Sequence, residues 1–196
     1  MNYDEYIVQL LEKAEEYKAE GAFEKAVEII QKILMQEPNC IEAYEELGDN
    51  YLSLKKFKKA ENALLQAIKI ASKSSNAHYL LGFLYSNSEE WGKSVKELKE
   101  ANKYSPNHPE ILRCLGWAVY NANRRNQGIS ILERSRNLSP MDPNILCDLG
   151  VCYMNSLNYE ESQQMFEKVL KIDPNSAQAH ECLSVLKVLK ANGSKK

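Results

Sequence analysis

Hydrophobic residues along the chain recur at intervals of three and four positions, which is the spacing of one face of an α-helix. The runs YEELGDNYLSL and HYLLGFLYS show this spacing. Runs of this kind are followed by a short turn, such as SEEW or LNY, and then by a second amphipathic run, such as KSVKELKEANKYSP. Proline ends several of the second runs, because its ring and its missing N–H do not fit inside a helix. No alternating apolar run is long enough to indicate a strand, so the pattern predicts an all-α protein.

The two-helix pattern repeats with a period of 34 residues. A Leu-Gly pair begins at Leu47, Leu81, Leu115 and Leu149. Three residues after the glycine the copies have Tyr51, Tyr85, Val119 and Tyr153. A small residue follows further along each copy, a large apolar residue comes four positions later, and the last three of these copies close on Pro106, Pro140 and Pro174. A period of this length is typical of a solenoid, in which each copy buries its apolar face against the next.

The recurring residues resemble the pattern of the tetratricopeptide repeat family. One copy carries it as Tyr44, Leu47, Gly48, Tyr51, Ala60, Leu64 and Ala67, and the next as His78, Leu81, Gly82, Tyr85, Leu98, Ala101 and Pro106. Three positions depart from the pattern, namely Lys13, Arg125 and Ser72. The resemblance implies a right-handed α-solenoid of five helix-turn-helix repeats followed by a C-terminal capping helix.

The period also sets the expected boundaries. We expect one solenoid over residues 1–191, with repeats at about 7–40, 41–74, 75–108, 109–142 and 143–176 and a capping helix at 177–191. Residues 192–196 are expected to form a flexible tail.

Composition excludes several classes of function. The net charge of −2 argues against general attraction to nucleic acid or to anionic membranes, and no apolar run approaches the ~20 residues that span a bilayer. The acidic N-terminus does not resemble a secretory signal, so we expect a cytoplasmic protein. No nucleotide-binding, metalloprotease or serine-hydrolase motif occurs, and the five cysteines include no CxxC pair. The sequence therefore predicts a protein that is not an enzyme and that holds no cofactor or metal.

In the family that the chain resembles, the first helix of each repeat lines a concave groove that binds peptides. If the glycine and the tyrosine face the core, residues three and two before the glycine, one after it, and four and five after it face the groove. The first two repeats then give an acidic part, Glu12, Glu15, Glu45, Glu46 and Asp49. The next three repeats give a more apolar part, Tyr79, Phe83, Asn87, Arg113, Trp117, Tyr120, Asn121, Asp148, Met154 and Asn155.

Two features of this groove have alternative explanations. The aromatic rings of Phe83 and Trp117 either bind a partner, as tryptophan and tyrosine often do at interfaces, or pack between repeats. Asn87, Asn121 and Asn155 either end the first helix in a left-handed conformation or offer their carboxamides to the backbone of a bound peptide.

The resulting prediction is a scaffold that binds a protein or peptide in the groove, with an apolar anchor near Trp117 and basic residues toward the N-terminal end. The alternative is a self-assembling structural protein that associates weakly through exposed Val185, Val188 and Leu189 near the C-terminus. Nucleic-acid binding is a weaker third possibility, through the basic turns KKFKK and Arg124-Arg125, because no interleaved basic and aromatic pattern is present.

Overall fold

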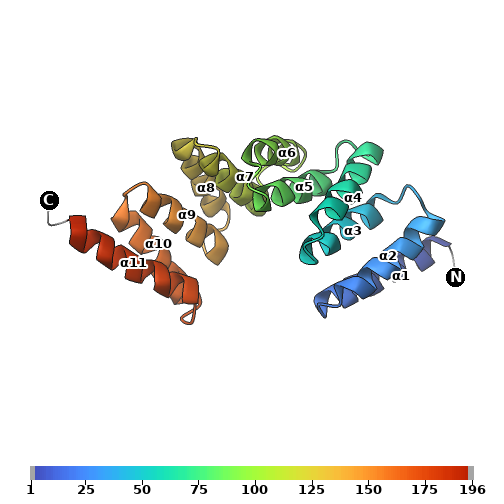
Figure 1. The fold of residues 1–196 in the computed structure, drawn as a ribbon, viewed down its shortest axis with the longest axis horizontal. Coiled ribbons are helices and arrows are strands. Elements are labelled where there is room, and N and C mark those ends of the chain that lie inside the picture. The colour runs from blue at the N-terminus through green and yellow to red at the C-terminus, as the bar shows by residue number, and fades with distance from the viewer. Residues whose placement is uncertain (1–2, 194–196) are drawn as a thin grey trace. The chain divides into compact units, whose positions relative to one another are not determined.

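The computed structural model describes residues 3–193, and within this range it contains eleven helices and no strand (Figure 1). The prediction of an all-α fold built from helix pairs is therefore confirmed. The helices are α1 (Tyr3–Ala19), α2 (Phe23–Gln36), α3 (Ile41–Ser53), α4 (Phe57–Ile70), α5 (Ser75–Asn87), α6 (Trp91–Tyr104), α7 (Pro109–Asn121), α8 (Arg125–Leu138), α9 (Pro143–Asn155), α10 (Tyr159–Ile172) and α11 (Ala177–Gly193). None of the described helices is both long enough and apolar enough to span a membrane.

The helices form five antiparallel pairs, α1 with α2 through α9 with α10, and α11 follows the last pair. The chain divides into two compact units, the first running to Ser105 and holding α1–α6, and the second starting at Pro106 and holding α7–α11. The expectation of one continuous solenoid stays a prediction. The predicted tail is 192–196. Its first two residues, 192 and 193, are the last residues of α11, and residues 194–196 lie outside the described residues.

Within each unit the helices form two layers. The first helices of neighbouring repeats pack on one another, α3 on α5 in the first unit, and α7 on α9 and α9 on α11 in the second. Within a unit, a second helix also packs on the first helix of the next repeat, as α2 does on α3, α4 on α5, α8 on α9 and α10 on α11. The cores are apolar, with Ile30 and Leu64 fully buried in the first unit and Leu132 and Phe166 fully buried in the second.

The repeated glycine lets the paired helices approach closely. At Gly48 an added Cβ would lie 2.6 Å from the side chain of Leu64, the large apolar residue that recurs in the second helix. The α7–α8 pair is closer still, because an added Cβ at Gly128 would lie 2.6 Å from the backbone nitrogen of Tyr120 and 2.7 Å from the carbonyl oxygen of Gly116. The small residues of the 34-residue pattern therefore lie where one helix packs directly against another.

Candidate partner-binding faces

The groove predicted from the sequence corresponds in each unit to the solvent side of the first helices, which we call the first-helix face. On α3 this face carries Glu45 and Asp49, whereas Tyr44, Leu47 and Tyr51 lie on the opposite side of the helix, because residues three and four apart share a face. The same register places the face on α1 and α5 in the first unit, and on α7, α9 and α11 in the second unit.

The acidic part of the first unit is largely occupied by side chains of this chain. Lys18 on α1 reaches α3, where its Nζ lies 3.0 Å from Glu46 and 2.5 Å from Asp49. Burial alone would lower the pKa of Lys18, but the two carboxylates raise it above its ordinary value. Glu45 accepts hydrogen bonds from the Ser74 hydroxyl and, at 2.8 Å, from the amide of Asn76. Three of the five predicted acidic residues are therefore engaged.

The remaining acidic residues of this face, Glu12 and Glu15, are exposed on α1. On α5 the half-buried rings of Tyr79 and Phe83 lie 6.4 Å apart and pack against the core of the first unit, while Asn87 is exposed at the end of the helix. The first unit therefore has an acidic edge on α1 and an aromatic pair on α5.

In the second unit, α7 presents a half-buried tryptophan. The ring of Trp117 stacks on that of Tyr120, with centroids 6.5 Å apart and planes 16° apart. Tyr120 itself, predicted to line the groove, lies in the core: it is 6% exposed, and its hydroxyl donates to the Cys152 carbonyl oxygen at 3.2 Å. The reason is the glycine at position 128, which has no side chain and lets α8 lie directly against the Tyr120 backbone.

An ion-pair cluster joins α7 to α9 on this face. The Arg113 guanidinium donates to Asp148 Oδ2 at 2.7 Å and, through its Nε, to Glu110 Oε2 at 2.7 Å. Burial lowers the pKa of Arg113, but Glu110 raises it. The net effect is an increase in this pKa, so the guanidinium stays charged. Burial also raises the pKa of Asp148, against the opposing effect of Arg113. With one cation and two carboxylates, the cluster keeps a negative charge when all three groups are ionised, and Glu110 is a member that sequence reasoning missed.

Apolar side chains of α9 and α11 extend the face of the second unit. Met154 is half-buried and Asn155 exposed at the end of α9. On α11, Val185 and Val188 are 43% and 61% exposed, and Leu189 beside them is half-buried. Counted by the 34-residue period, Val185 corresponds to Trp117 and Val188 to Met154, so these valines belong to the first-helix face. Self-association through the three residues stays a prediction, and the period also places the two valines in the groove register.

The recurring asparagines do not take the left-handed conformation proposed for them. The left-handed residues lie two positions later, at Glu89 (φ 57°), Asn123 (φ 66°) and Leu157 (φ 64°). Asn87, Asn121 and Asn155 are instead the last residues of α5, α7 and α9. The Asn121 amide donates to the Trp117 carbonyl oxygen at 2.9 Å, which fixes its direction along the face. The left-handed explanation is therefore wrong, and peptide binding by these amides stays a prediction.

The described residues contain no group of three or more histidines, cysteines and carboxylates able to hold a metal. The three buried thiols lack the features of nucleophiles, because burial raises the pKa of Cys114 to about 12, that of Cys147 to about 11 and that of Cys152 to about 12. What the two faces offer is apolar surface, fixed charges and hydrogen-bonding amides, which suit the recognition of another macromolecule.

Comparisons with known proteins agree with this geometry. Two family models, both described as tetratricopeptide repeat, match residues 17–84 and 143–176. No curated protein matches the chain. Among solved structures, the chain is similar to TTC0263, described as a thermophilic tetratricopeptide repeat protein of Thermus thermophilus, with 16% identity, a TM-score of 0.78 and coverage of 93% of this chain and 99% of that one.

Two further solved structures show the same fold. Pseudomonas aeruginosa pilF is 16% identical, with a TM-score of 0.77 and coverage of 98% of this chain and 99% of that one. YrrB, described as a tetratricopeptide repeat protein with an unusual peptide-binding site, is 19% identical, with a TM-score of 0.69 and coverage of 89% and 90%. At these identities the likeness concerns the fold alone.

Proposed function

The chain belongs to the tetratricopeptide repeat family, and we propose that it is a non-enzymatic scaffold that binds a partner protein or peptide on its first-helix faces. YrrB supports the proposal, since its structure is described as having a peptide-binding site. The proposal assigns the apolar contact to the second unit and the contact with basic residues to the first.

The observation that carries the proposal is the apolar surface of the second unit. Five side chains from α7, α9 and α11 share the first-helix register, namely Trp117, Val151, Met154, Val185 and Val188. None of the five is fully buried, and Val188 is the most exposed of them. Apolar surface of this kind, with a tryptophan in it and charged residues beside it, is typical of sites that bind another protein.

The charge of the first unit supports a partner with basic residues. After the pairing of Glu46 and Asp49 with Lys18, the exposed carboxylates are Glu12 and Glu15 on α1. They act mainly on the rate of association and on its salt dependence, since exposed charges contribute little to the final affinity. The apolar anchor therefore supplies most of the binding free energy in this proposal.

The test uses a charge placed in the apolar surface. Val188→Lys and the control Met35→Lys alter side chains that are exposed in the free protein, and Met35 lies on α2, away from the first-helix face. Both variants are expected to melt like the wild type. Immobilised wild type and control should retain the same binding proteins from a cell extract, and Val188→Lys should lose them. Each retained protein is then purified, and its dissociation constant for Val188→Lys should be about tenfold or more above that for the wild type. A retained protein that binds the wild type, Met35→Lys and Val188→Lys with equal affinity contradicts the proposal.

A second candidate is self-assembly through Val185, Val188 and Leu189, and the exposure of the two valines favours it. Sedimentation of the wild type and of a Val185→Lys, Leu189→Lys double variant tests it. Concentration-dependent association in the wild type, absent from the variant, is the expected result. A wild type that stays monomeric at high concentration rules this candidate out, as does a variant that associates equally well.

A further inference from the structure

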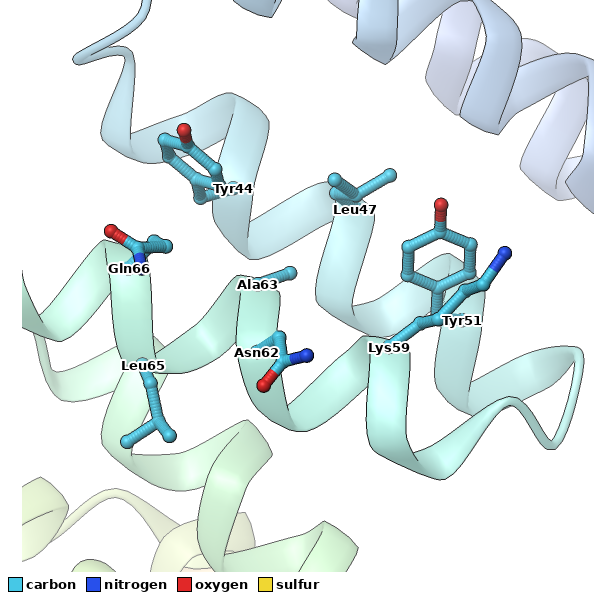
Figure 2. A pocket seen from close by; sticks show the side chains of 8 residues that line it. All are labelled: Tyr44, Leu47, Tyr51, Lys59, Asn62, Ala63, Leu65 and Gln66. Carbon is cyan, nitrogen blue, oxygen red and sulfur yellow. The ribbon is translucent and has the colours of Figure 1, made fainter.

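The second repeat carries a pocket on the side of α3 opposite to the first-helix face. Figure 2 shows Tyr44, Leu47 and Tyr51 following one another along α3, with Lys59 and Ala63 along α4 beside them. Asn62, Leu65 and Gln66 complete the lining. The pocket has a volume of about 470 Å³, within the ~300–1,000 Å³ of typical ligand pockets.

Two residues distinguish the lining of this pocket from the matching positions of the other repeats. Ala63 occupies a position where the other repeats carry longer side chains, namely Ile29, Glu97, Ile131 and Met165. Leu65 is 45% exposed at a position where the others carry polar residues, namely Gln31, Lys99, Glu133 and Glu167. The second repeat therefore has a small side chain where the other repeats have a large one, and an apolar residue where the others have a polar one.

The chain segment that contains α4 is strongly basic, although the whole chain is slightly acidic. Residues 53–75 contain six lysines, namely Lys55, Lys56, Lys58, Lys59, Lys69 and Lys73, and one acidic residue, Glu61. Glu61 accepts a hydrogen bond from the Tyr85 hydroxyl at 2.7 Å. None of the six lysines forms an ion pair with a described residue.

The lysines of α4 lie beside the apolar lining. Lys58, Leu65 and Lys69 are seven and four residues apart, so they form one stripe along the exposed side of the helix. Lys59 lies on the neighbouring stripe with Ala63, and its Nζ is 5.6 Å from the centre of the Tyr51 ring, which holds it at the wall of the pocket. One lysine therefore lies in the wall of the pocket, and two more lie on the same stripe of α4 as Leu65, which lines it.

We propose that this pocket binds an acidic segment of a partner protein, with one large apolar side chain in the pocket and flanking carboxylates on the lysines. The inference goes beyond the proposed function, because it concerns the opposite side of α3 and a partner of opposite charge. A peptide fits better than a nucleic acid, because the lining offers no row of open rings for successive bases: Tyr51, beside Lys59, is buried, and Tyr44 is half-buried.

The probe is a fluorescein-labelled peptide with a single tryptophan flanked on both sides by aspartate and glutamate, and its binding is followed by fluorescence anisotropy. A second peptide, with alanine in place of the tryptophan, tests the anchor. Ala63→Met fills the pocket with the side chain that the fifth repeat carries at the same position. Lys58→Glu with Lys69→Glu reverses the charge of the stripe, and Lys168→Glu with Lys171→Glu on α10 gives the same change of net charge elsewhere.

The wild type should bind the tryptophan peptide, with an affinity that falls as salt is added. Ala63→Met, the reversed stripe and the alanine peptide should each weaken binding about tenfold or more, whereas the α10 variant should stay within about twofold of the wild type. Circular dichroism establishes that Ala63→Met is folded.

Three kinds of result overturn the proposal. One kind concerns the peptide itself: either the wild type does not bind it, or a folded Ala63→Met variant binds it as well as the wild type does. Another is tighter binding of a single-stranded RNA oligomer than of the peptide. If the RNA binding is lost when Lys58 and Lys69 are reversed and is unchanged by Ala63→Met, the surface binds nucleic acid. The third is self-association of the wild type that the reversed stripe abolishes, which makes a second copy of the chain the occupant.

Discussion

Adding one methyl group at Gly128 should destabilise the second unit strongly. Gly128 lies in the first turn of α8 and is buried against α7. A Cβ there would lie 2.6 Å from the Tyr120 backbone nitrogen and 2.7 Å from the Gly116 carbonyl oxygen. These neighbours are backbone atoms inside a helix, so no side-chain rotation relieves the clash, and α7 and α8 must move apart.

The expected cost follows from this geometry. Overpacking a tight interior costs about 1–3 kcal/mol, and the fixed neighbours place Gly128→Ala at the upper end, near 3 kcal/mol. For a chain of this size each kcal/mol lowers the melting temperature by roughly 2–4 °C, so a fall of roughly 6–12 °C is expected. This is a large part of a total stability of about 5–15 kcal/mol.

Gly92 supplies the matched control. It lies in the first turn of α6, has no atom within 4 Å of an added Cβ, and needs no left-handed backbone. Gly92→Ala should therefore leave the melting temperature unchanged or raise it slightly, because alanine is the better helix former by up to about 1 kcal/mol. Thermal unfolding followed by circular dichroism compares both variants with the wild type.

Tryptophan fluorescence then locates the damage. The chain has two tryptophans, Trp91 in the first unit and Trp117 in the second, so a Trp91→Phe background leaves a single reporter beside the α7–α8 contact. In this background Gly128→Ala should lower the urea midpoint of the Trp117 signal. A Gly128→Ala protein that unfolds like the wild type, or a Gly92→Ala protein that is equally damaged, would refute the packing argument.

Three further predictions concern charges and thiols. Glu97 lies 2.8 Å from the ring of His78 in a buried hydrogen bond, so Glu97→Ala, which leaves the ring nitrogen without this partner, should cost about 1–3 kcal/mol in chemical denaturation, and Glu97→Gln, which keeps an acceptor oxygen, should cost less. Lys18→Ala should free two carboxylates on α3, so a basic peptide should associate faster in stopped-flow mixing and with a steeper salt dependence; an unchanged rate would contradict an acidic first-helix face. Iodoacetamide at pH 8 should label the half-buried Cys40 and Cys182 before the three buried cysteines, whose raised pKa values keep them as thiols; mass spectrometry of the modified peptides reads the order.

The helix pairs were predictable from the sequence because packing alone determines the repeated positions. A residue such as Gly48 can only be small, since Leu64 lies where its Cβ would be, and this demand returns once per repeat. The same periodicity also places Val185 and Val188 in the register of the first-helix face. Self-association through them stays a prediction, because the register alone does not decide which partner covers them.

The turns were harder to predict because their conformation is not tied to one residue type. The left-handed position after the first helix is filled by Lys55, Glu89, Asn123 and Leu157 in successive repeats. Asparagine and glycine favour this conformation, yet here the position two residues earlier carries the repeated asparagine. The geometry of the helix pair recurs in every repeat and requires the left-handed conformation at this position. Residues of several types therefore adopt it.

The charge of the groove could not be predicted because ion pairs depend on reach across helices. The sequence shows a row of carboxylates at Glu45, Glu46 and Asp49, but it does not show that Lys18, about one repeat earlier, lies within 3.0 Å of two of them. Tyr120 illustrates the same limit for an aromatic ring. Its register predicts the groove, and the close approach of α8 places it in the core.

The two proposed sites share α3 but use opposite sides of it. Carboxylates at Glu45 and Asp49 project on the first-helix face, while Tyr44 and Leu47 line the pocket, because the helix turns by about 100° per residue. A basic segment on one side and an acidic segment on the other therefore do not compete for the same side chains. Each site can be removed without touching the other, since Ala63→Met leaves the carboxylates unchanged and substitutions of Val188 lie in the other unit. The failure of one proposal would therefore leave the other standing.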